Sequence, residues 1–316
     1  MKKVGVMRGG VSDQYDFSLE TGAEVARAVQ DAGFEAIDML LDKDGILHLK
    51  GIPADLEKVE GSVDMVWNAL HGDFGEDGKV QELFDNFGIP YTGSGRLASS
   101  MAYHKELAKE RVAELGIKTP VHVLIFPDGS ESVSEITRRI YTKIAPPWVV
   151  KPLAGGASGQ TYFAFTTLEL AQIVEDSVSH AVPFIAEQYI FGKEVAVGVM
   201  DEFRNTAPYV LPPIEIDTPN RGILTRDMRA VTHISQKNTL SQQEKERIID
   251  LAKQIHTHMG AKDYSQVEFI IDPRGEVYFI EIDTHPHLQE SAPFREALGR
   301  VGASFSDFVK SIIDKK

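Results

Sequence analysis

Cysteine is absent from this chain of 316 residues. Its absence excludes disulfide bonds, catalysis by a thiolate and zinc sites with cysteine ligands. A reducing compartment fits such a composition, and we expect a cytoplasmic protein. No stretch approaches the roughly 18 consecutive apolar residues of a membrane span, and no apolar signal core follows the first residues. We therefore expect no membrane partner.

Positive charge is also scarce, because 33 lysines and arginines face 47 aspartates and glutamates, for a formal net charge of −14. Sequence-independent binding to nucleic acid needs a basic field, so we expect no nucleic-acid partner. A local basic pocket for a phosphorylated ligand stays compatible with this balance. The length and the 42% of hydrophobic residues allow two or three domains with buried cores.

The first hundred residues alternate between strand and helix patterns. Apolar runs at 3–8, 35–40 and 63–70 read as strands, and a helix through about residue 32 follows Gly9 and Gly10. This alternation is typical of a parallel sheet, and we expect a Rossmann-like domain over residues 1–97. Neither a complete dinucleotide fingerprint nor a P-loop motif is present. A single helix is expected over 98–115.

The middle of the chain contains a lysine at the edge of a predicted strand. Residues 147–152 form that strand, Lys151 is near its end, and the glycine-rich segment 153–159 follows. A lysine and a glycine-rich loop can hold a triphosphate, although a glycine-rich hairpin turn fits equally well. Glu187 and Glu194 lie on two later strands, 184–189 and 194–200. Taken alone, such acids are more typical of a surface.

Residues 266–288 predict a hairpin with three carboxylates. Glu281 and Asp283 alternate with Ile280 and Ile282, so they share one strand face, which we also assign to the residues at 277 and 279. Folding the hairpin brings Glu268 opposite them. Converging carboxylates repel one another unless a cation lies among them, and oxygen ligands without cysteine favour Mg²⁺ or Mn²⁺. The alternative is a solvated hairpin face with scattered acids.

Two further segments precede this hairpin in the chain. The polar stretch 217–238 has no clear period and predicts a long functional loop. Ser241 and Glu244 form a capping box that opens a helix, and Gly260 ends it. We expect a central domain over 98–183 and a third domain over 184–316.

The order of these features resembles the ATP-grasp superfamily and, more narrowly, the D-alanine–D-alanine ligase family. The resemblance covers essentially the whole chain. Its strongest segments are RGGVSDQYDFSLETG (8–22), ALHGDFGEDGKVQ (69–81), IPYTGSG (89–95) with the later Lys105, and FIEIDTHP (279–286). It implies an α/β fold in which a Rossmann-like parallel-sheet domain precedes two α+β domains that clasp ATP.

The resemblance also implies a set of site residues. The phosphates of ATP would be bound by Lys105 and Lys151, the adenine by Glu187 with the hinge Gln188, Tyr189 and Ile190, and the ribose by Glu194. Two Mg²⁺ ions would be held by Glu268, Glu281 and Asp283, the last in place of the family's usual asparagine.

The amino-acid site matches the family less closely. Gln14 replaces a glutamate that binds the first substrate's ammonium, Gln266 replaces an arginine that stabilises the oxyanion, and His287 replaces a glycine. Losing one oxyanion donor typically costs about 10²–10³ in rate. His287 is either a new oxyanion donor or acid–base group, or a residue that fills space.

Four other positions complete the predicted amino-acid site. Ala157-Ser158 replaces a pair of serines, and Ala292 replaces a substrate-binding serine, with Ser291 adjacent. Arg226 is the nearest match to a lysine–tyrosine pair in the long loop. His71 either contacts a substrate carboxylate or organises its loop. We take Gln266, His287 and Ser158 as candidate catalytic residues, and Gln14, His71, Arg226 and Ser291 as candidate substrate-binding residues.

The implied activity is ATP-dependent ligation of two small amino-acid substrates, first of all D-alanine with D-alanine for peptidoglycan synthesis. A second hypothesis keeps the reaction and changes the amino-acid or hydroxy-acid substrates, and the altered positions favour it. A third is a nucleotide-binding regulatory protein without ligase activity. The family resemblance further implies a homodimer.

Overall fold

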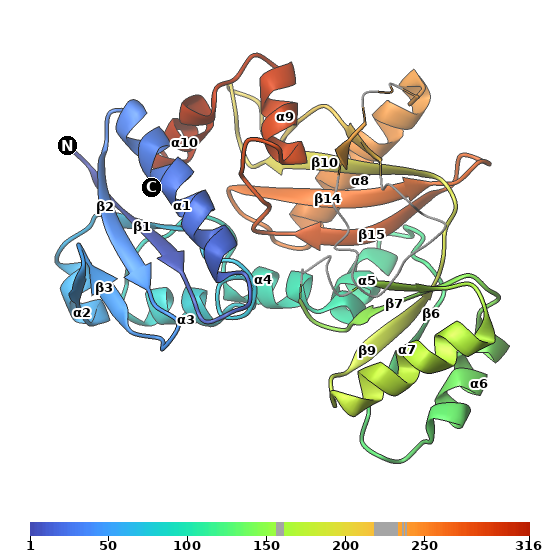
Figure 1. Ribbon diagram of the computed structural model, residues 1–316. Helices are drawn as coiled ribbons and strands as arrows, with labels where there is room; N and C mark the ends of the chain where they lie inside the picture. Colours follow the sequence, from blue (N-terminus) through green and yellow to red (C-terminus); the bar gives the residue numbers. More distant parts are fainter. Residues whose placement is uncertain (156–160, 218–232, 236, 238) are drawn as a thin grey trace.

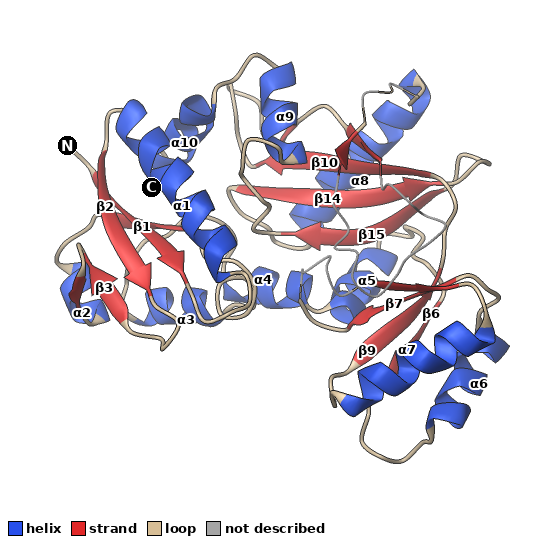
Figure 2. Cartoon of the chain, in the orientation of Figure 1, coloured by secondary structure: helices blue, strands red, loops and turns tan. Residues whose placement is uncertain are grey.

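The computed structural model describes residues 1–155, 161–217, 233–235, 237 and 239–316, and three β-sheets lie in these ranges (Figure 1). Helices cover the sheets, and a pair of helices crosses the middle of the molecule between them (Figure 2). None of the helices in the described ranges is both long and apolar enough to cross a lipid bilayer.

The first sheet is five-stranded, in the order β4-β3-β2-β1-β5, and β1 pairs in parallel with both β2 and β5. This confirms the strand–helix alternation read from the sequence. An antiparallel extension, β3 and β4, follows β2 at one edge. The strands of the first sheet and the helices in the same part of the chain are β1 (Lys3–Gly9), α1 (Tyr15–Asp31), β2 (Glu35–Leu41), β3 (Leu47–Leu49), β4 (Ile52–Pro53), α2 (Leu56–Glu60), β5 (Met65–Asn68) and α3 (Lys79–Asn86).

The single helix expected over 98–115 is wrong, because the structure has two helices there, α4 (Arg96–Tyr103) and α5 (Lys105–Ala113). His104 interrupts them with an extended backbone (φ −98°, ψ 106°) and forms a bridge with Ala154. Its imidazole also accepts a hydrogen bond from the backbone N–H of Leu107, so the same residue caps α5. The break directs Lys105 toward residues 153–155, where its backbone N–H donates to Leu153 and its ammonium to Gly155.

The second sheet is antiparallel and four-stranded, in the order β6-β9-β7-β8. Helices α6 and α7 cover one face, where Trp148, Val150 and Ala186 are buried. Because side chains alternate along a strand, Lys151 and Glu187 lie on the opposite face. The elements are β6 (His122–Ile125), α6 (Val133–Lys143), β7 (Trp148–Pro152), β8 (Tyr162–Ala164), α7 (Thr167–Ser179) and β9 (Phe184–Gln188).

Strand β9 bears on the domain boundaries. We expected residues 184–316 to form the third domain, yet β9 pairs with β6 and β7 inside the second sheet. This pairing favours a boundary at about residue 189, between β9 and β10.

The third sheet is six-stranded, with β13-β12-β10-β14-β15 in order and β11 paired to β10. Helices α5 and α8 pack on one face, against a cluster that includes Val197, Val267 and Phe269. The capping box at Ser241 is present, and α8 ends just before Gly260, as predicted. The elements are β10 (Lys193–Met200), β11 (Tyr209–Val210), β12 (Ile214–Asp217), β13 (His233–Ile234), α8 (Gln242–His258), β14 (Tyr264–Ile271), β15 (Val277–Asp283), α9 (Pro293–Arg300) and α10 (Phe305–Ile313).

Strand β15 carries a β-bulge that changes the predicted face of its acids. Glu268 is opposite Glu281, whereas its neighbour Phe269 is opposite Phe279, so Ile280 is an extra residue. Val277 and Phe279 join the buried cluster under α5 and α8, as does Ile282 beyond the bulge. Glu281 and Asp283 therefore share a face, as predicted, but not the face of Val277 and Phe279. The bulge turns both acids away from the apolar core.

The C-terminal helix joins the third sheet to the first. Helix α10 packs against α1, so the two chain ends lie on the same part of the molecule (Figure 1). Phe308 of α10 is fully buried and contacts the rings of Trp67, Tyr264 and Phe294. One apolar cluster therefore spans elements from both ends of the chain.

Candidate active site

Three lysines and one glutamate form the buried centre of the predicted nucleotide site. The carboxylate of Glu187 lies between two ammonium groups, 2.9 Å from Nζ of Lys109 and 3.0 Å from Nζ of Lys151. Lys105 is close by, and its ammonium donates to the carbonyl oxygen of Gly155. Lys151 and Glu187 come from the face of the second sheet opposite α6 and α7, and the other two lysines come from α5.

The pKa values of these groups follow from burial and mutual charge. Burial alone would raise the pKa of Glu187, but Lys109 and Lys151 outweigh it and lower the pKa to about 2. Burial lowers the pKa of Lys105 to about 8, attraction from Glu281 opposes this, and repulsion from Lys151 adds to it. Burial also acts against the charge of Lys151, yet Glu187 and Glu281 raise its pKa. Glu187 is therefore ionised and Lys151 is cationic at neutral pH.

This arrangement leaves Glu187 less available to an adenine than the sequence comparison implied. A carboxylate offers about four lone-pair positions, and two of them face lysines here. The adjoining hinge is anchored to the second sheet, because the N–H of Gln188 donates to Val121 and the N–H of Tyr189 to Pro147. Ile190 is buried beside them.

The three predicted metal ligands lie on one face of the β14–β15 pair. Glu268 is directly opposite Glu281, and Asp283 is opposite Gln266. Glu194, on β10, is on the same face, because Ala196 is opposite Glu268 and side chains alternate. Burial raises the pKa of Glu268 well above its usual range, and repulsion from Glu281, Glu194 and Asp283 raises it further.

Asp283 has the same character. Burial and the charge of Glu76 raise its pKa well above that of an ordinary aspartate, although the N–H of His285 donates to its Oδ1 over 2.7 Å. A group of acids that resists ionisation is stabilised in its charged form by a cation.

This donor set fits Mg²⁺. Across the described residues, no three histidine, aspartate or glutamate side chains already converge closely enough to hold an ion by themselves. Magnesium is usually bound by only one or two carboxylates together with substrate phosphates and water, so a site completed by a nucleotide suits this geometry.

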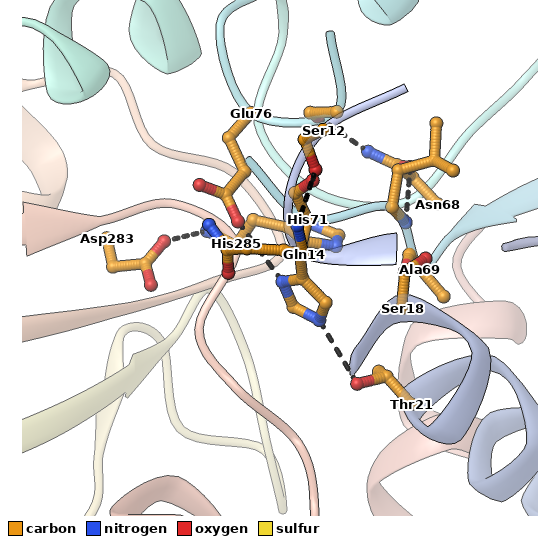
Figure 3. A network of polar contacts seen from close by, with 12 residues as sticks. Ser12, Gln14, Ser18, Thr21, Asn68, Ala69, His71, Glu76, Asp283 and His285 are labelled. Atoms are coloured by element: carbon orange, nitrogen blue, oxygen red, sulfur yellow. Dashed lines mark hydrogen bonds and ion pairs between the residues drawn. The ribbon is translucent and has the colours of Figure 1, made fainter. Parts of the chain in front are cut away.

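A buried polar network extends from the first sheet toward these acids (Figure 3). His71 uses both ring nitrogens, with Nδ1 3.1 Å from Oε1 of Glu76 and Nε2 3.1 Å from Oγ1 of Thr21. Gln289 donates to the same threonine hydroxyl over 3.1 Å. Burial lowers the pKa of His71 to about 3, so its imidazole is neutral. These contacts favour the interpretation in which His71 organises its loop.

Three imidazoles and one phenyl ring gather beside that network. His287 stacks on His71 with a centroid distance of 5.0 Å, and Phe17 meets His287 edge-on at 4.2 Å. His285 lies 5.3 Å from His71. Burial, together with His71, lowers the pKa of His287 to about 3, and its Nδ1 is buried without a hydrogen-bond partner. The ring contacts of His287 support the space-filling interpretation, and its unpartnered Nδ1 supports the donor interpretation.

The remaining predicted residues lie around this cluster or outside the described ranges. The side-chain amide of Gln14 lies against Gly72, next to His71. Gln266 donates to Oε1 of Glu268 over 3.1 Å, Ser291 is exposed and Ala292 is buried at the start of α9. Ala157, Ser158 and Arg226 lie outside the residues that the structure describes, as does most of the predicted loop 217–238, although β13 falls within it.

Sequence reasoning missed three members of the site: Lys109, Glu76 and His285. Lys109 follows Lys105 by four residues, so helical spacing alone could have placed both on one side of α5. Glu76 and His285 lie inside the segments that carried the family resemblance, but no charge pattern marked them. Their roles depend on contacts between distant segments.

The raised pKa of Glu76 leads us to expect that the stability of the folded protein depends on pH. Burial, followed by repulsion from Asp73, Asp77 and Glu281, raises its pKa to about 7. The native state then holds a proton that the unfolded state releases at lower pH, so stability falls as pH rises between about 4.5 and 7. Relative to the wild type, Glu76→Gln should gain up to about 3 kcal/mol of unfolding free energy across that window. Urea unfolding of both proteins in EDTA at several pH values measures this, and parallel curves would contradict it.

The chain is similar to known proteins in both sequence and structure. The family model described as the D-ala D-ala ligase C-terminus matches residues 112–314, and the model of the corresponding N-terminus matches residues 50–94. A D-alanine–D-alanine ligase of Carboxydothermus hydrogenoformans is 30% identical over 315 residues, covering 98% of this chain and 97% of the relative. One from Fervidobacterium nodosum is 32% identical over 324 residues, with 98% and 97% covered.

Solved structures share the fold at lower identity. The VanG D-Ala:D-Ser ligase of Enterococcus faecalis superposes with a TM-score of 0.86 at 24% identity, covering 99% of this chain and 98% of the other. A D-alanine–D-alanine ligase of Bacillus anthracis complexed with ATP superposes with a TM-score of 0.79 at 24% identity, covering 99% and 97%. These likenesses confirm the fold expected from the sequence.

Proposed function

Because this chain belongs to the D-alanine–D-alanine ligase family, we propose that it ligates D-alanine to D-alanine with cleavage of ATP to ADP and phosphate. The same family assignment supports a role in peptidoglycan synthesis. Relatives that carry this activity in their names align with nearly the full length of the chain.

The observation that carries the proposal is the position of Glu281 between two sets of charges. Its carboxylate acts on the pKa values of both Lys105 and Lys151, and also on that of Glu268. The lysine wall of the site, formed by Lys105 of α5 and Lys151 of the second sheet, therefore lies opposite its acidic wall, formed by Glu268 and Glu281 of the third sheet. A nucleoside triphosphate requires this arrangement, with cations on one wall of its site and metal-binding acids on the other.

In the first step, the carboxylate of one D-alanine attacks the γ-phosphorus of ATP, and the bond to the β-phosphate oxygen breaks to give an acyl phosphate and ADP. Lys105 and Lys151 neutralise charge on the phosphates. Glu268, Glu281 and Asp283 would hold Mg²⁺, which when bound neutralises charge on the phosphate oxygens. We assign the adenine to Glu187 with Gln188–Ile190, and the ribose to Glu194.

In the second step, the amine of the other D-alanine attacks the acyl carbon, loses a proton and displaces phosphate through a tetrahedral intermediate. The amide of Gln266, the hydroxyl of Ser158 and His287 are proposed as donors to the developing oxyanion. A neutral imidazole can donate one N–H, and the low pKa of His287 keeps it neutral. Gln14, Arg226 and Ser291 are proposed to bind the substrates, and His71, whose ring nitrogens both have partners, is proposed to order the loop beside them.

A second candidate is the same reaction with a different second substrate. The ring cluster of Phe17, His71, His285 and His287 favours it, because it includes His287, which replaces a glycine of the family. One structural neighbour is itself named a D-Ala:D-Ser ligase.

One experiment separates these candidates: ADP release with Mg²⁺ and ATP across D- and L-amino acids and hydroxy acids, with mass spectrometry of the products. We expect turnover that depends on D-alanine and yields the dipeptide. Turnover with D-serine or a hydroxy acid in the second position would favour the second candidate. ATP binding without turnover for any substrate would contradict both and support the regulatory hypothesis.

We also propose a cytoplasmic homodimer, supported by membership of the family. Analytical ultracentrifugation tests the dimer, which predicts a single species near twice the chain mass of 35.0 kDa.

A further inference from the structure

Lys109 is a buried lysine in α5 whose ammonium is enclosed by the protein. Its nitrogen lies 2.9 Å from Oε1 of Glu187 and 3.2 Å from the carbonyl oxygen of Ile280. The ring of Phe279 is 5.9 Å away, and only 2% of the residue is exposed. The ammonium group donates a hydrogen bond to the carbonyl of Ile280 and forms an ion pair with Glu187. Lys109 therefore acts on other residues of the site and not on a ligand.

The residue on which it acts is Glu187, which joins two lysines. Oε1 of Glu187 faces Lys109, and Oε2 faces Lys151. From this geometry we infer that Lys109 is a positioning residue of the nucleotide site: it holds Glu187 in place and thereby leaves the charge of Lys151 available to phosphate. This inference rests on the proposed function, because the phosphates are those of ATP.

Charge balance explains why Lys109 matters. Lys105, Lys109 and Lys151 contribute three ammonium groups, and the carboxylate of Glu187 lies between the last two. Without Lys109 the site loses one positive charge, and Lys151 is the one ion-pair partner of Glu187 left among the described residues. Lys151 would then be drawn to the carboxylate in competition with the nucleotide.

Lys109 also connects the two walls of the site. Ile280, whose carbonyl oxygen accepts its hydrogen bond, is the extra residue of the bulge and directly precedes Glu281. Glu187 belongs to β9 of the second sheet. A single side chain thus fixes the lysine wall relative to the acidic wall.

The test is Lys109→Met, with ATP affinity measured by calorimetry in the presence of Mg²⁺ and without an acceptor, and steady-state kinetics measured in parallel. Breaking a buried ion pair is strongly destabilising, and only part of this loss should appear in binding. We expect the Kd and KM for ATP to rise about 10–100-fold, and the KM for D-alanine to change less than about 2-fold. Lys109→Arg should restore ATP affinity to within about 5-fold.

Lys118→Met is the matched control. Its ammonium pairs with the carboxylate of Glu276 over 2.7 Å beside the same strand, but both side chains are exposed. It should leave ATP affinity and kinetics unchanged, because exposed ion pairs contribute little. An equal loss in both lysine variants would contradict a specific role for Lys109.

A double-mutant cycle covers the case in which Lys109→Met does not fold. If Lys109 acts through Glu187, then adding Lys109→Met to Glu187→Gln should change the Kd for ATP less than about 2-fold. A further loss of about 10-fold in that background would overturn the inference, as would unchanged ATP affinity or equal changes in every kinetic parameter of the folded single variant. Because ATP binding is measured without an acceptor, failure of the wild type to form dipeptide contradicts the proposed function alone.

Discussion

Replacing Glu281 by glutamine is expected to lower kcat for dipeptide synthesis by at least about 10³-fold. Glu281 is opposite Glu268 on the acidic wall and is also the acid that acts on both phosphate lysines. Glutamine keeps the shape and one oxygen but removes the charge that Mg²⁺ and the lysines share. The Mg²⁺ concentration for half-maximal rate should rise in the same variant.

The same hairpin supplies a control. Glu276 lies in the turn region, pairs with Lys118 and is exposed, so Glu276→Gln should leave kcat within about 2-fold of the wild type. Thermal unfolding of both variants shows whether each is folded. A folded Glu281→Gln protein with nearly normal kcat and Mg²⁺ dependence would remove Glu281 from the metal site.

Restoring the family's arginine at position 266 should raise kcat about 10–100-fold. Gln266 is buried, opposite Asp283, and gives Glu268 one neutral hydrogen bond. An arginine there would lie between two acids whose pKa values are raised, and it would donate charged hydrogen bonds to the tetrahedral intermediate. The dipeptide assay with saturating substrates measures the gain.

Gln266→Lys is the informative comparison, because it adds the same charge without the planar fork of arginine. We expect it to gain less than Gln266→Arg. A folded arginine variant that is slower than the wild type would mean that the pocket is adapted to glutamine, which supports the candidate with a different second substrate.

The overall ATP-grasp architecture could be predicted from the sequence because its signals are local. Alternating apolar runs, the capping box at Ser241 and the glycine at 260 each depend on a few neighbouring residues, and the structure has the expected elements at all three. The helix over 98–115 was wrong because the break at His104 depends on Ala154, which is 50 residues away in the chain. Strand pairing with a distant segment leaves no periodic trace.

The candidate site could be predicted only in part, for the same reason. Lys151, Glu187 and the acids of β14 and β15 lie at positions where family motifs are read directly. Lys109 needed the packing of α5 against the second sheet, and the ring cluster needed Phe17, His71 and His287 to meet from three segments. The tertiary fold brings such groups together, and neither composition nor spacing in the sequence reveals it.

The bulge at Ile280 shifts the alternation of side chains along β15 by one residue. Up to Phe279 the odd-numbered residues face the apolar core. After Ile280 the odd-numbered residues are the two acids of the site, and the even-numbered Ile282 faces the core. If β15 were a regular strand that kept Ile280 without a bulge, alternation would put Glu281 and Asp283 on the core face with Phe279, at a cost of several kcal/mol each. The inserted residue also separates two sets of constraints: the first half of the strand is free to change with the helices beneath it, and the second half with the substrate above it.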